Sequence, residues 1–403
     1  MEALILSHAQ DTNGQNERFV RAARKHGKDT VVVRALAIGN DDPAGVVGRY
    51  RMAAEKLGGL SIRSVARTVH YFDWPTDIEW TRSNEPLIRQ LVDEADVLHL
   101  NNSYRAVQRF HAQKPMLLHH HGSMFRNNTE HMLKMAHQRR WVQAVSTIDL
   151  TKPAPDVLHW LPTAYDIADL VKFGRKHARK PDGRIRVVHC PTNRELKSTA
   201  VLIAAVDELR AEGLPVDLVI VEGRTWADTM GEKAKADIVF DQTAFGYGCN
   251  AVEAWGMGIP VIAGADEATL YAMRRRFYPH SLPFEEATDA TIIDAIRALA
   301  TSADKRAEMA AVGHDHVLRW HDERPALVKL AELYALTIQT YHHKAASAAD
   351  AVRFRNSGRQ TIRIDDASVL RPKADITTDD PDVINRLRHF AQKRPMWGIE
   401  EIA

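Results

Sequence analysis

The sequence predicts an α/β protein built from two doubly wound parallel sheets. Short apolar runs typical of buried strands alternate with stretches of helical apolar spacing, a pattern characteristic of parallel sheets covered by helices. The chain has 403 residues, which is more than one hydrophobic core usually spans. A basic and polar stretch at residues 172–184 interrupts the alternation and is interpreted as an interdomain linker. We therefore expect Rossmann-like domains at residues 1–175 and 176–345, followed by a helical and polar extension at residues 346–403 to which no role is assigned.

The first half begins with a short strand at residues 3–6, a polar loop, and a helix at about residues 17–26. The polar loop contains Asp11 and Gly14 but no GxGxxG motif. It therefore offers at most one close backbone approach to a ligand, which disfavours a nicotinamide dinucleotide site. Later strands of this half are expected at residues 30–36, 65–71, 97–100, 116–120 and 142–146.

The second half shows the same alternation. Its expected strands are residues 186–190, 216–221 and 238–241, and a helix with a clear apolar face is expected at residues 199–212. Beyond Leu282 the chain is expected to be mainly helical, with a long apolar stripe at about residues 324–341.

Residues 236–264 (ADIVFDQTAFGYGCNAVEAWGMGIPVIAG) have the pattern of strand, glycine loop, short helix, turn and strand. The apolar run of the first strand ends at Asp241, as buried parallel strands do when their carboxyl ends reach a ligand site. Gly246 and Gly248 bracket Tyr247, so the backbone there can approach a ligand closely. An ordinary strand-to-helix turn, whose glycines only shape the backbone, is the alternative interpretation.

The short helix is expected to begin at about Cys249. Its N-terminus presents free N–H groups and the positive end of the helix dipole, which suit a phosphate. Glu253 lies one turn further on, within reach of a sugar hydroxyl beside that phosphate. The loop CPTNRELKST, after an earlier strand, places Arg194 and Lys197 at the same edge of the sheet. Two cations there can neutralise a diphosphate without a metal, although in isolation both could be exposed loop charges.

The histidine triplet at residues 119–121 does not predict a metal site. Strand alternation puts His119 and His121 on one face and His120 on the other, so the three cannot converge on one ion. His121, at the strand end, is expected to face the ligand site, and the other two to be packing residues. His314, Asp315 and His316, near the entry of a helix, are expected at the surface.

The composition of the chain argues against several classes of function. Hydrophobic residues make up 45% and charged residues 26% of the chain, and the formal charge is +2, so the overall charge gives no case for nucleic-acid or anionic-membrane binding. The two cysteines, Cys190 and Cys249, have no CxxC partner, which argues against a disulfide framework. The N-terminus has no basic region and no stretch reaches transmembrane length. We therefore expect a cytoplasmic protein.

The two loops together resemble the donor half of GT-B glycosyltransferases. CPTNRELKST followed by DQTAFGYGCNAVEAWGMGIPVIAG is similar to the pattern of the large retaining family 4 (glycosyl transferases group 1), and the match covers roughly residues 187–264. Weaker similarities are ADVLHLNN, LLHHHG, WLPTAYD and RWHDERP. The resemblance implies two Rossmann-like domains facing a cleft, and transfer of a sugar from a UDP- or GDP-type nucleotide sugar, with retention and without an essential metal.

The resemblance also assigns roles to residues. Arg194 and Lys197 would bind the donor diphosphate, Glu253 would hold the ribose, and His121 would lie beside the donor sugar. The candidate donor-binding residues are Arg194, Lys197, Gly223, Asp241, Gly246, Tyr247, Gly248, Cys249, Asn250 and Glu253. The candidate catalytic residues are His121, Arg194 and Lys197, and the candidate substrate contacts are Asp11, Gly14, His121 and Phe245.

One position departs from the pattern of the family. The first glutamate of its Glu-x7-Glu pair, which contacts the transferred sugar, corresponds to Phe245 here, and Asp241 could cover part of that role. A nucleotide-sugar binding protein that has lost turnover, an epimerase on the same scaffold, and a transferase acting on modified DNA bases are therefore kept as alternatives. The sequence selects neither the acceptor, which could be a glycan, lipid, small molecule, protein or modified DNA, nor the donor sugar and base.

Overall fold

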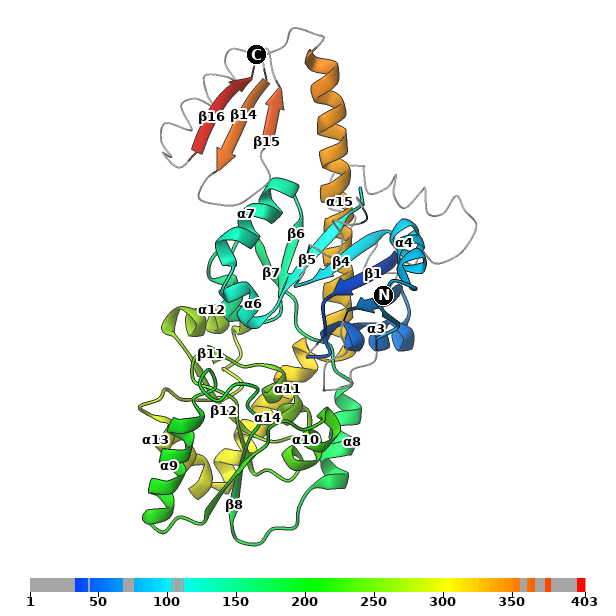
Figure 1. Cartoon of the computed structure of the whole chain (residues 1–403). Coiled ribbons are helices and arrows are strands. Elements are labelled where there is room, and N and C mark those ends of the chain that lie inside the picture. The colour runs from blue at the N-terminus through cyan, green and yellow to red at the C-terminus, as the bar shows by residue number, and fades with distance from the viewer. Residues whose placement is uncertain are drawn as a thin grey trace.

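The computed structural model describes residues 33–42, 44–67, 76–102, 104, 110, 112–355, 361–366, 374–377 and 397–402, with side chains described up to residue 342. Two large sheets lie in two separate lobes, and a small third sheet lies beyond them (Figure 1). The strand expected at residues 3–6, the helix expected at 17–26, and the candidate residues Asp11 and Gly14 lie outside the described residues.

The first sheet has seven strands in the order β3-β2-β1-β4-β5-β6-β7, all paired in parallel. This is the doubly wound arrangement predicted from the sequence, in which the chain reverses direction across the sheet between β1 and β4. The strands are β1 (Val33–Gly39), β2 (Leu60–Ala66), β3 (Ile78–Glu79), β4 (Val97–Asn101), β5 (Met116–His120), β6 (Val142–Val145) and β7 (Leu158–Trp160).

Helices cover both faces of this sheet, because successive strand residues point to opposite sides. In β1, Ala35 and Ala37 pack under α3 (Val46–Leu57) and α15 (Glu323–Arg355), whereas Leu36 and Ile38 face the opposite layer. That layer contains α4 (Glu85–Glu94), α6 (Gly122–Arg126), α7 (Thr129–Arg139) and the 3₁₀ helix η2 (Ile148–Thr151).

The second sheet has its parallel strands in the order β9-β8-β10-β12-β13, with the short strand β11 antiparallel to the end of β12. The strands are β8 (Ile185–His189), β9 (Val216–Ile220), β10 (Ile238–Phe240), β11 (Phe245–Gly246), β12 (Val261–Ala265) and β13 (Glu285–Glu286). One face packs against α9 (Thr199–Ala211) and α13 (Ile292–Thr301). The other packs against α10 (Trp226–Lys233), α11 (Cys249–Gly256), α12 (Glu267–Phe277) and α14 (Ala303–Trp320).

The linker expected at residues 172–184 is shorter than predicted. Helix α8 (Ile167–His177) includes its first six residues, because this segment packs closely against α11. A Cβ on Gly174 would lie 2.8 Å from the Cβ of Met257, and one on Gly256 would lie 2.5 Å from Leu170 Cδ1. Arg175, Lys176 and His177 of this stretch thus belong to the last turn of a packed helix.

Helix α15 joins the two lobes. The apolar stripe expected at residues 324–341 is confirmed, but the helix continues to Arg355 and packs Leu327, Leu330 and Tyr334 against the first sheet. It then extends past that lobe toward the three-stranded antiparallel sheet of β14 (Thr361–Asp366), β15 (Ala374–Thr377) and β16 (Trp397–Ile402) (Figure 1). The residue boundaries predicted for the domains stay a prediction.

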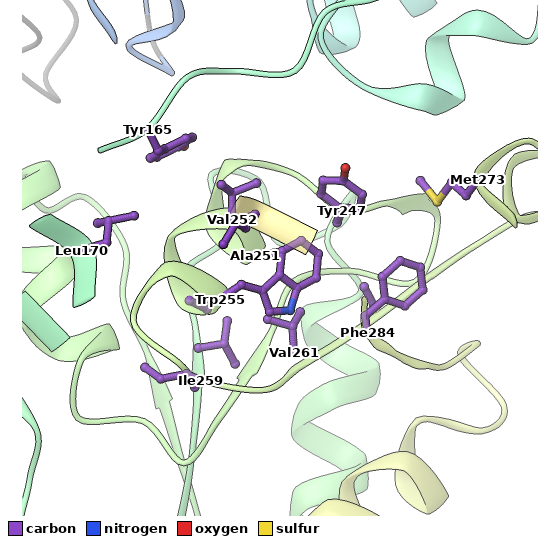
Figure 2. Close-up of a cluster of buried hydrophobic side chains, with 14 of the residues drawn as sticks. Tyr165, Leu170, Tyr247, Ala251, Val252, Trp255, Ile259, Val261, Met273 and Phe284 are labelled. Carbon is purple, nitrogen blue, oxygen red and sulfur yellow. The ribbon is translucent and has the colours of Figure 1, made fainter. Parts of the chain in front are cut away.

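A shared apolar cluster connects the lobes. Trp255 of α11, with Tyr247 and Phe284 around it, forms its centre, and Tyr165, from the segment that leads out of the first sheet, packs at its edge (Figure 2). Trp160 of β7 reaches the same cluster through Phe277, at a ring-centroid distance of 5.9 Å. No helix among the described residues is both long and apolar enough to cross a membrane.

Candidate functional site

The candidate donor residues gather where the second sheet reverses its winding. The chain leaves β8 toward β9 on one side and leaves β10 toward β12 on the other, and the following helices α9 and α11 lie on opposite faces. Ligands of open α/β sheets bind at such switch points, outside the carboxyl ends of the strands. Lys197 and Asp241 follow β8 and β10, respectively.

Asp241 ties the two loops together. Its Oδ1 accepts a hydrogen bond from Lys197 Nζ at 3.2 Å, and its Oδ2 accepts one from the backbone N–H of Gly248 at 2.7 Å. The Asp241 side chain is 1% exposed and that of Lys197 is 22% exposed. A buried carboxylate needs partners of this kind, so the arrangement holds a cation at the start of α11, as expected from the sequence.

The glycine loop is shaped for a close approach of the backbone. Gly246 has a φ of +79°, which favours glycine, and a Cβ there would lie 2.2 Å from Met273 Cε, so the Met273 side chain would have to move. Gly248, by contrast, has an extended backbone and serves as the N-cap residue of α11. The Tyr247 side chain points into the core (Figure 2), so only its backbone is available to a ligand at this loop.

The hydroxyl of Tyr247 lies 2.9 Å from His316 Nε2 and 3.1 Å from His321 Nε2. Burial, together with the neighbouring His321, holds the pKa of His316 well below its usual value. The expectation that His316 lies at the surface is therefore wrong, because α14 packs this residue against Trp255 and Phe277.

Three further candidate donor residues have structural roles. Asn250 Nδ2 donates to the carbonyl of Phe240 at 3.4 Å, which joins the start of α11 to the end of β10. Burial raises the pKa of Cys249, and it raises that of Cys190 to about 11, so neither thiol is a nucleophile at neutral pH. Gly223 has a φ of +63° in the loop after β9.

Arg194 is more exposed than Lys197. Its side chain is 57% exposed and forms a two-point ion pair with Glu222, with Nε 2.9 Å from Oε1 and Nη2 2.6 Å from Oε2. The hydrogen bonds and the charge of Glu222 raise the pKa of Arg194. Arg194 lies at the rim, as predicted, but its positive charge is shared with a carboxylate.

Glu253 is the centre of a buried charged cluster that the sequence did not reveal. Its carboxylate accepts hydrogen bonds from Lys233 Nζ at 2.6 Å, Trp226 Nε1 at 2.9 Å and Arg49 Nη2 at 3.0 Å, and the Tyr165 hydroxyl lies 3.5 Å away. Burial alone would raise the pKa of Glu253, but the positive charges of Lys233 and Arg49 more than offset it and lower the pKa.

This cluster spans both lobes. Arg49 comes from α3 of the first lobe, and its guanidinium carbon lies 3.8 Å from the centroid of the Tyr165 ring. Trp226 and Lys233 occupy the first and last positions of α10, two helical turns apart and so on one face. Lys233 is 1% exposed and therefore calls for a carboxylate partner, but its burial is visible only in the structure, so no local signal in the sequence indicates the cluster.

On the first lobe, neutral polar side chains follow β4 and β5, whereas Asp41 and Asp42 follow β1, and Asp42 accepts hydrogen bonds from the backbone N–H groups of Val47 and Gly48. His121 Nε2 lies within hydrogen-bonding distance of Asn101 Oδ1, and the His121 backbone N–H donates to Asn102 Oδ1 at 2.7 Å. Burial lowers the pKa of His121 to about 3, so the imidazole is neutral at physiological pH. The side chain is only half-buried, consistent with the expected position at the strand end.

The other two histidines of the triplet are packing residues, as predicted. The His119 ring lies 4.2 Å from that of His121, on the same face of the sheet, and its Nδ1 lies 3.1 Å from His99 Nε2. His120 points the other way and lies 2.9 Å from Gln143 Oε1. Within the described part of the chain, no group of three or more His, Cys, Asp or Glu residues could hold a metal ion.

Phe245 contacts the first lobe. The guanidinium carbon of Arg126, in α6, lies 4.0 Å from the centroid of the Phe245 ring. Arg126 in turn donates to Asp149 Oδ2 of η2 from Nε at 2.9 Å and from Nη2 at 2.6 Å. Arg126, a cation of the first lobe, therefore lies against position 245, where the pattern of glycosyltransferase family 4 has a glutamate.

Known structures share this architecture. HepE from Anabaena, solved with UDP-glucose, has a TM-score of 0.53 and 14% identity, over 75% of this chain and 99% of that chain. A glycosyltransferase from Rickettsia africae has a TM-score of 0.52 and 12% identity, over 77% of this chain and 99% of that chain. An α-glucosyltransferase solved with UDP and a 13-mer DNA containing an HMU base has a TM-score of 0.52 and 8% identity, over 75% and 99%.

The chain has the GT-B fold. The two doubly wound sheets match nearly the whole length of these structures, which confirms the fold expected from the sequence. At such low identities the similarity establishes the fold and not the chemistry. No protein-family model matches the sequence, and no curated protein matches it.

Within the GT-B fold, the candidate residues form two groups. Lys197, Asp241, the glycine loop and the start of α11 come together on the second lobe, and Arg194 lies at their rim. His121 lies at a strand end of the first lobe. Sequence reasoning missed the residues that bind the lobes to each other, which are Arg49, Arg126, Asp149, Tyr165, Trp226 and Lys233.

Proposed function

We propose that the protein is a glycosyltransferase that moves a sugar from a nucleoside diphosphate sugar to an acceptor hydroxyl. The observation that carries the proposal is the position of Lys197 and the α11 N-terminus, which meet through Asp241 at the switch point of the second sheet. Lys197 and the backbone N–H groups that follow Gly248 in the first turn of α11 suit a diphosphate, whereas the N–H of Gly248 itself is bonded to Asp241. The GT-B fold, shared with a protein solved with UDP-glucose, supports the same donor class.

In this proposal, the bond from the anomeric carbon to the diphosphate oxygen breaks, and its electron pair stays on the diphosphate. Lys197, the backbone of residues 246–250 and the rim residue Arg194 stabilise the negative charge that develops there. These groups supply positive charge without a metal, so we propose a metal-independent reaction. Retention at the anomeric carbon rests on the sequence resemblance alone.

Glu253 is proposed to hold the donor ribose. The condition is that a ribose hydroxyl displaces one of the protein groups that now surround the carboxylate. Four protein groups already surround its carboxylate, which has about four lone-pair sites. Of the four, the Tyr165 hydroxyl is the most distant, at 3.5 Å. Its replacement by a ribose hydroxyl would break the weakest of these bonds and leave both ion pairs in place.

The first lobe is proposed to bind the acceptor. His121 is neutral and lies among the asparagine side chains at its strand ends, a surface that suits hydroxyl groups and not anions. Asp11 and Gly14, expected in the same region, stay a prediction. The assignment of residues 1–175 to the acceptor side and residues 176–345 to the donor side is part of this proposal, with α15 adding packing residues to the first lobe.

The direct test is a calorimetric titration of the full chain with UDP, GDP and their common sugar conjugates. Mass analysis after incubation with candidate glycans, lipids, small molecules, proteins and modified-base DNA then identifies a product. DNA is included because one similar structure was solved with a DNA oligonucleotide. Binding of a nucleoside diphosphate in the micromolar range supports the proposal, and the absence of binding to every nucleotide would overturn it.

A second candidate is a nucleotide-sugar binding protein without turnover. It is favoured by Phe245, which places no carboxylate at the expected sugar contact. This alternative predicts tight donor binding with neither hydrolysis nor transfer, so the same titration and mass analysis separate the two. An epimerase would instead change the sugar while it stays attached to the nucleotide. The cytoplasmic location expected from the sequence stays a prediction.

A further inference from the structure

Arg126 and Asp149 form an ion pair at the contact between the lobes. The Asp149 side chain is 3% exposed and that of Arg126 is 26% exposed. The 3₁₀ helix η2, which carries Asp149, contacts α6 on its own lobe and β11 on the other. The pair therefore lies against Phe245, at the end of the glycine loop opposite α11.

The pair has unused hydrogen-bonding capacity. Both donating atoms of Arg126, Nε and Nη2, contact the same oxygen of Asp149, which is Oδ2. The other oxygen, Oδ1, is buried and has no hydrogen-bond partner. Buried acceptors are normally satisfied, and none of the described residues supplies a hydrogen bond to this oxygen.

The Phe245 ring holds the guanidinium in place. Stacking at 4.0 Å favours a cation over the ring face and fixes the plane of the fork. A Cβ on Gly122 would lie 3.9 Å from Arg126 Nη1, so this nitrogen lies near Gly122, the residue after His121. The guanidinium of Arg126 thus lies near both Phe245 and the residue that follows His121.

We propose that the Arg126–Asp149 pair of the first lobe reads the hydroxyls of the transferred sugar, in place of a carboxylate at position 245. Asp149 Oδ1 accepts from one hydroxyl, and Arg126 Nη1 donates to another. Phe245 is then a platform for Arg126 and not a lost contact. This inference rests on the proposed function, because it assumes that the donor diphosphate lies at the α11 N-terminus.

The charges of the pair define the sugar class. Asp149 already neutralises Arg126, so the pair presents no net charge to the ligand. A neutral hexose offers hydroxyls that match one acceptor and one donor. A uronic acid would place a second carboxylate beside the buried Asp149, which like-charge repulsion disfavours. The proposed donor is therefore a nucleoside diphosphate of a neutral sugar.

The test compares UDP, UDP-glucose and UDP-glucuronate on the full chain, with GDP and GDP-mannose as the second series. Binding is measured by calorimetry for the wild-type protein and for Asp149→Asn. We expect the variant to bind the bare nucleoside diphosphate within about twofold of wild type and the neutral nucleotide sugar about tenfold more weakly, consistent with one hydrogen bond to a charged group. The wild type should also prefer the glucose over the glucuronate donor, and Asp149→Asn should reduce that preference.

Phe245→Glu provides a rescue. In the Asp149→Asn background, it returns a carboxylate to the position where the resembling pattern has one, and we expect it to recover most of the affinity for the neutral nucleotide sugar. Asp77→Asn is the matched control. Asp77, just before β3, also pairs with arginines of the first lobe, Arg51 in α3 and Arg63 in β2, but away from Phe245. Its donor binding should equal that of wild type.

The outcomes separate the two proposals. If the wild-type protein binds no nucleoside diphosphate, the proposed function fails. If it binds the nucleotide sugar and Asp149→Asn binds it equally well, only the sugar-reading role is overturned. If thermal melting shows that Asp149→Asn does not fold, Phe245→Leu carries the test. It keeps an apolar side chain but removes the stacking face, and unchanged discrimination between the glucose and glucuronate donors in this variant overturns the inference.

Discussion

The two sheets differ in the charges of the side chains at their strand ends. On the second sheet, Lys197 and Asp241 form an ion pair at the α11 N-terminus, with Arg194 and Glu222 at the rim. On the first sheet, Asn101, Asn102 and His121 make contacts between neutral groups at the ends of β4 and β5, and Asp41 and Asp42 follow β1. The same doubly wound topology thus places cations at the strand ends of one lobe, and neutral groups with two carboxylates at those of the other. This division suits a charged donor on one side and a hydroxyl acceptor on the other.

The largest expected effect comes from the histidines at and behind these neutral groups. Burial lowers the pKa of four of them, with His99 and His120 at about 4, His121 at about 3 and His119 well below its usual value. The unfolded chain, with histidine pKa values near 6.5, takes up protons that the folded chain does not. Stability is therefore present above about pH 6.5 and lost as the pH falls toward 4.

Each such histidine contributes about 1.4 kcal/mol of stability loss per pH unit below about 6.5, so the free energy of unfolding should fall by several kcal/mol between pH 6.5 and 5. Urea denaturation at a series of pH values measures this slope. His120→Phe keeps an aromatic ring against Phe125 and should reduce proton uptake on unfolding by about one. A free energy of unfolding that is flat over this range would contradict the neutral, buried state of the triplet.

A smaller effect on stability is expected in the charged cluster that joins the lobes. Glu253→Gln leaves Lys233 buried without its counter-charge and breaks the ion pair with Arg49, and removal of one partner of a buried ion pair typically costs about 3–5 kcal/mol. We expect a clear fall in the denaturation midpoint. Glu222→Gln, which removes the exposed partner of Arg194, is the matched control and should leave the midpoint nearly unchanged. Equal effects of the two variants would show that Glu253 is not buried between the lobes.

These two regions also show where prediction from sequence succeeds. The unit from β10 through α11 to β12 was predicted because its signals are local: an apolar run, glycines with a positive φ or a cap position, and a proline before the next strand. The loop that carries Lys197 was predicted for the same reason. A sheet edge gathers such loops automatically, so strand order alone brought Lys197 and Asp241 together.

The contacts between lobes were not predictable in this way. Arg49 and Glu253 are 204 residues apart in the chain, and Arg126 reaches Phe245 from a helix of the other lobe. Nothing in the local pattern around Arg49 or Arg126 distinguishes them from solvated helix charges. The long-range packing of α15 on the first sheet was missed for a similar reason, since an apolar stripe shows that a helix is buried but not against which sheet.

A third effect concerns ligand binding on the charged surface. Lys197→Ala removes the half-buried cation beside α11, and a charge-assisted contact is worth about 1.5–3 kcal/mol. Nucleoside diphosphate affinity should fall by at least about tenfold. Both cations are paired with a carboxylate, but Arg194→Ala should have the smaller effect, because the Arg194 side chain is 57% exposed and that of Lys197 only 22%. Calorimetric titration of both variants measures the difference, and full affinity in both would place the donor elsewhere.

The smallest effect is expected from chelation. If the diphosphate charge is met by Lys197, by Arg194 and by the N–H groups at the start of α11, a bound divalent cation adds little to donor affinity. Chelation should not affect the first sheet either, because His121 is hydrogen-bonded to Asn101 and no carboxylate orients it to bind a metal ion. Donor binding and transfer, measured after dialysis against EDTA, should stay within about twofold of the untreated protein, well below the effect of losing one charge-assisted contact. Loss of transfer in EDTA that manganese or magnesium restores would break the comparison, because it would mean that the charged surface is completed by an ion and not by its own side chains.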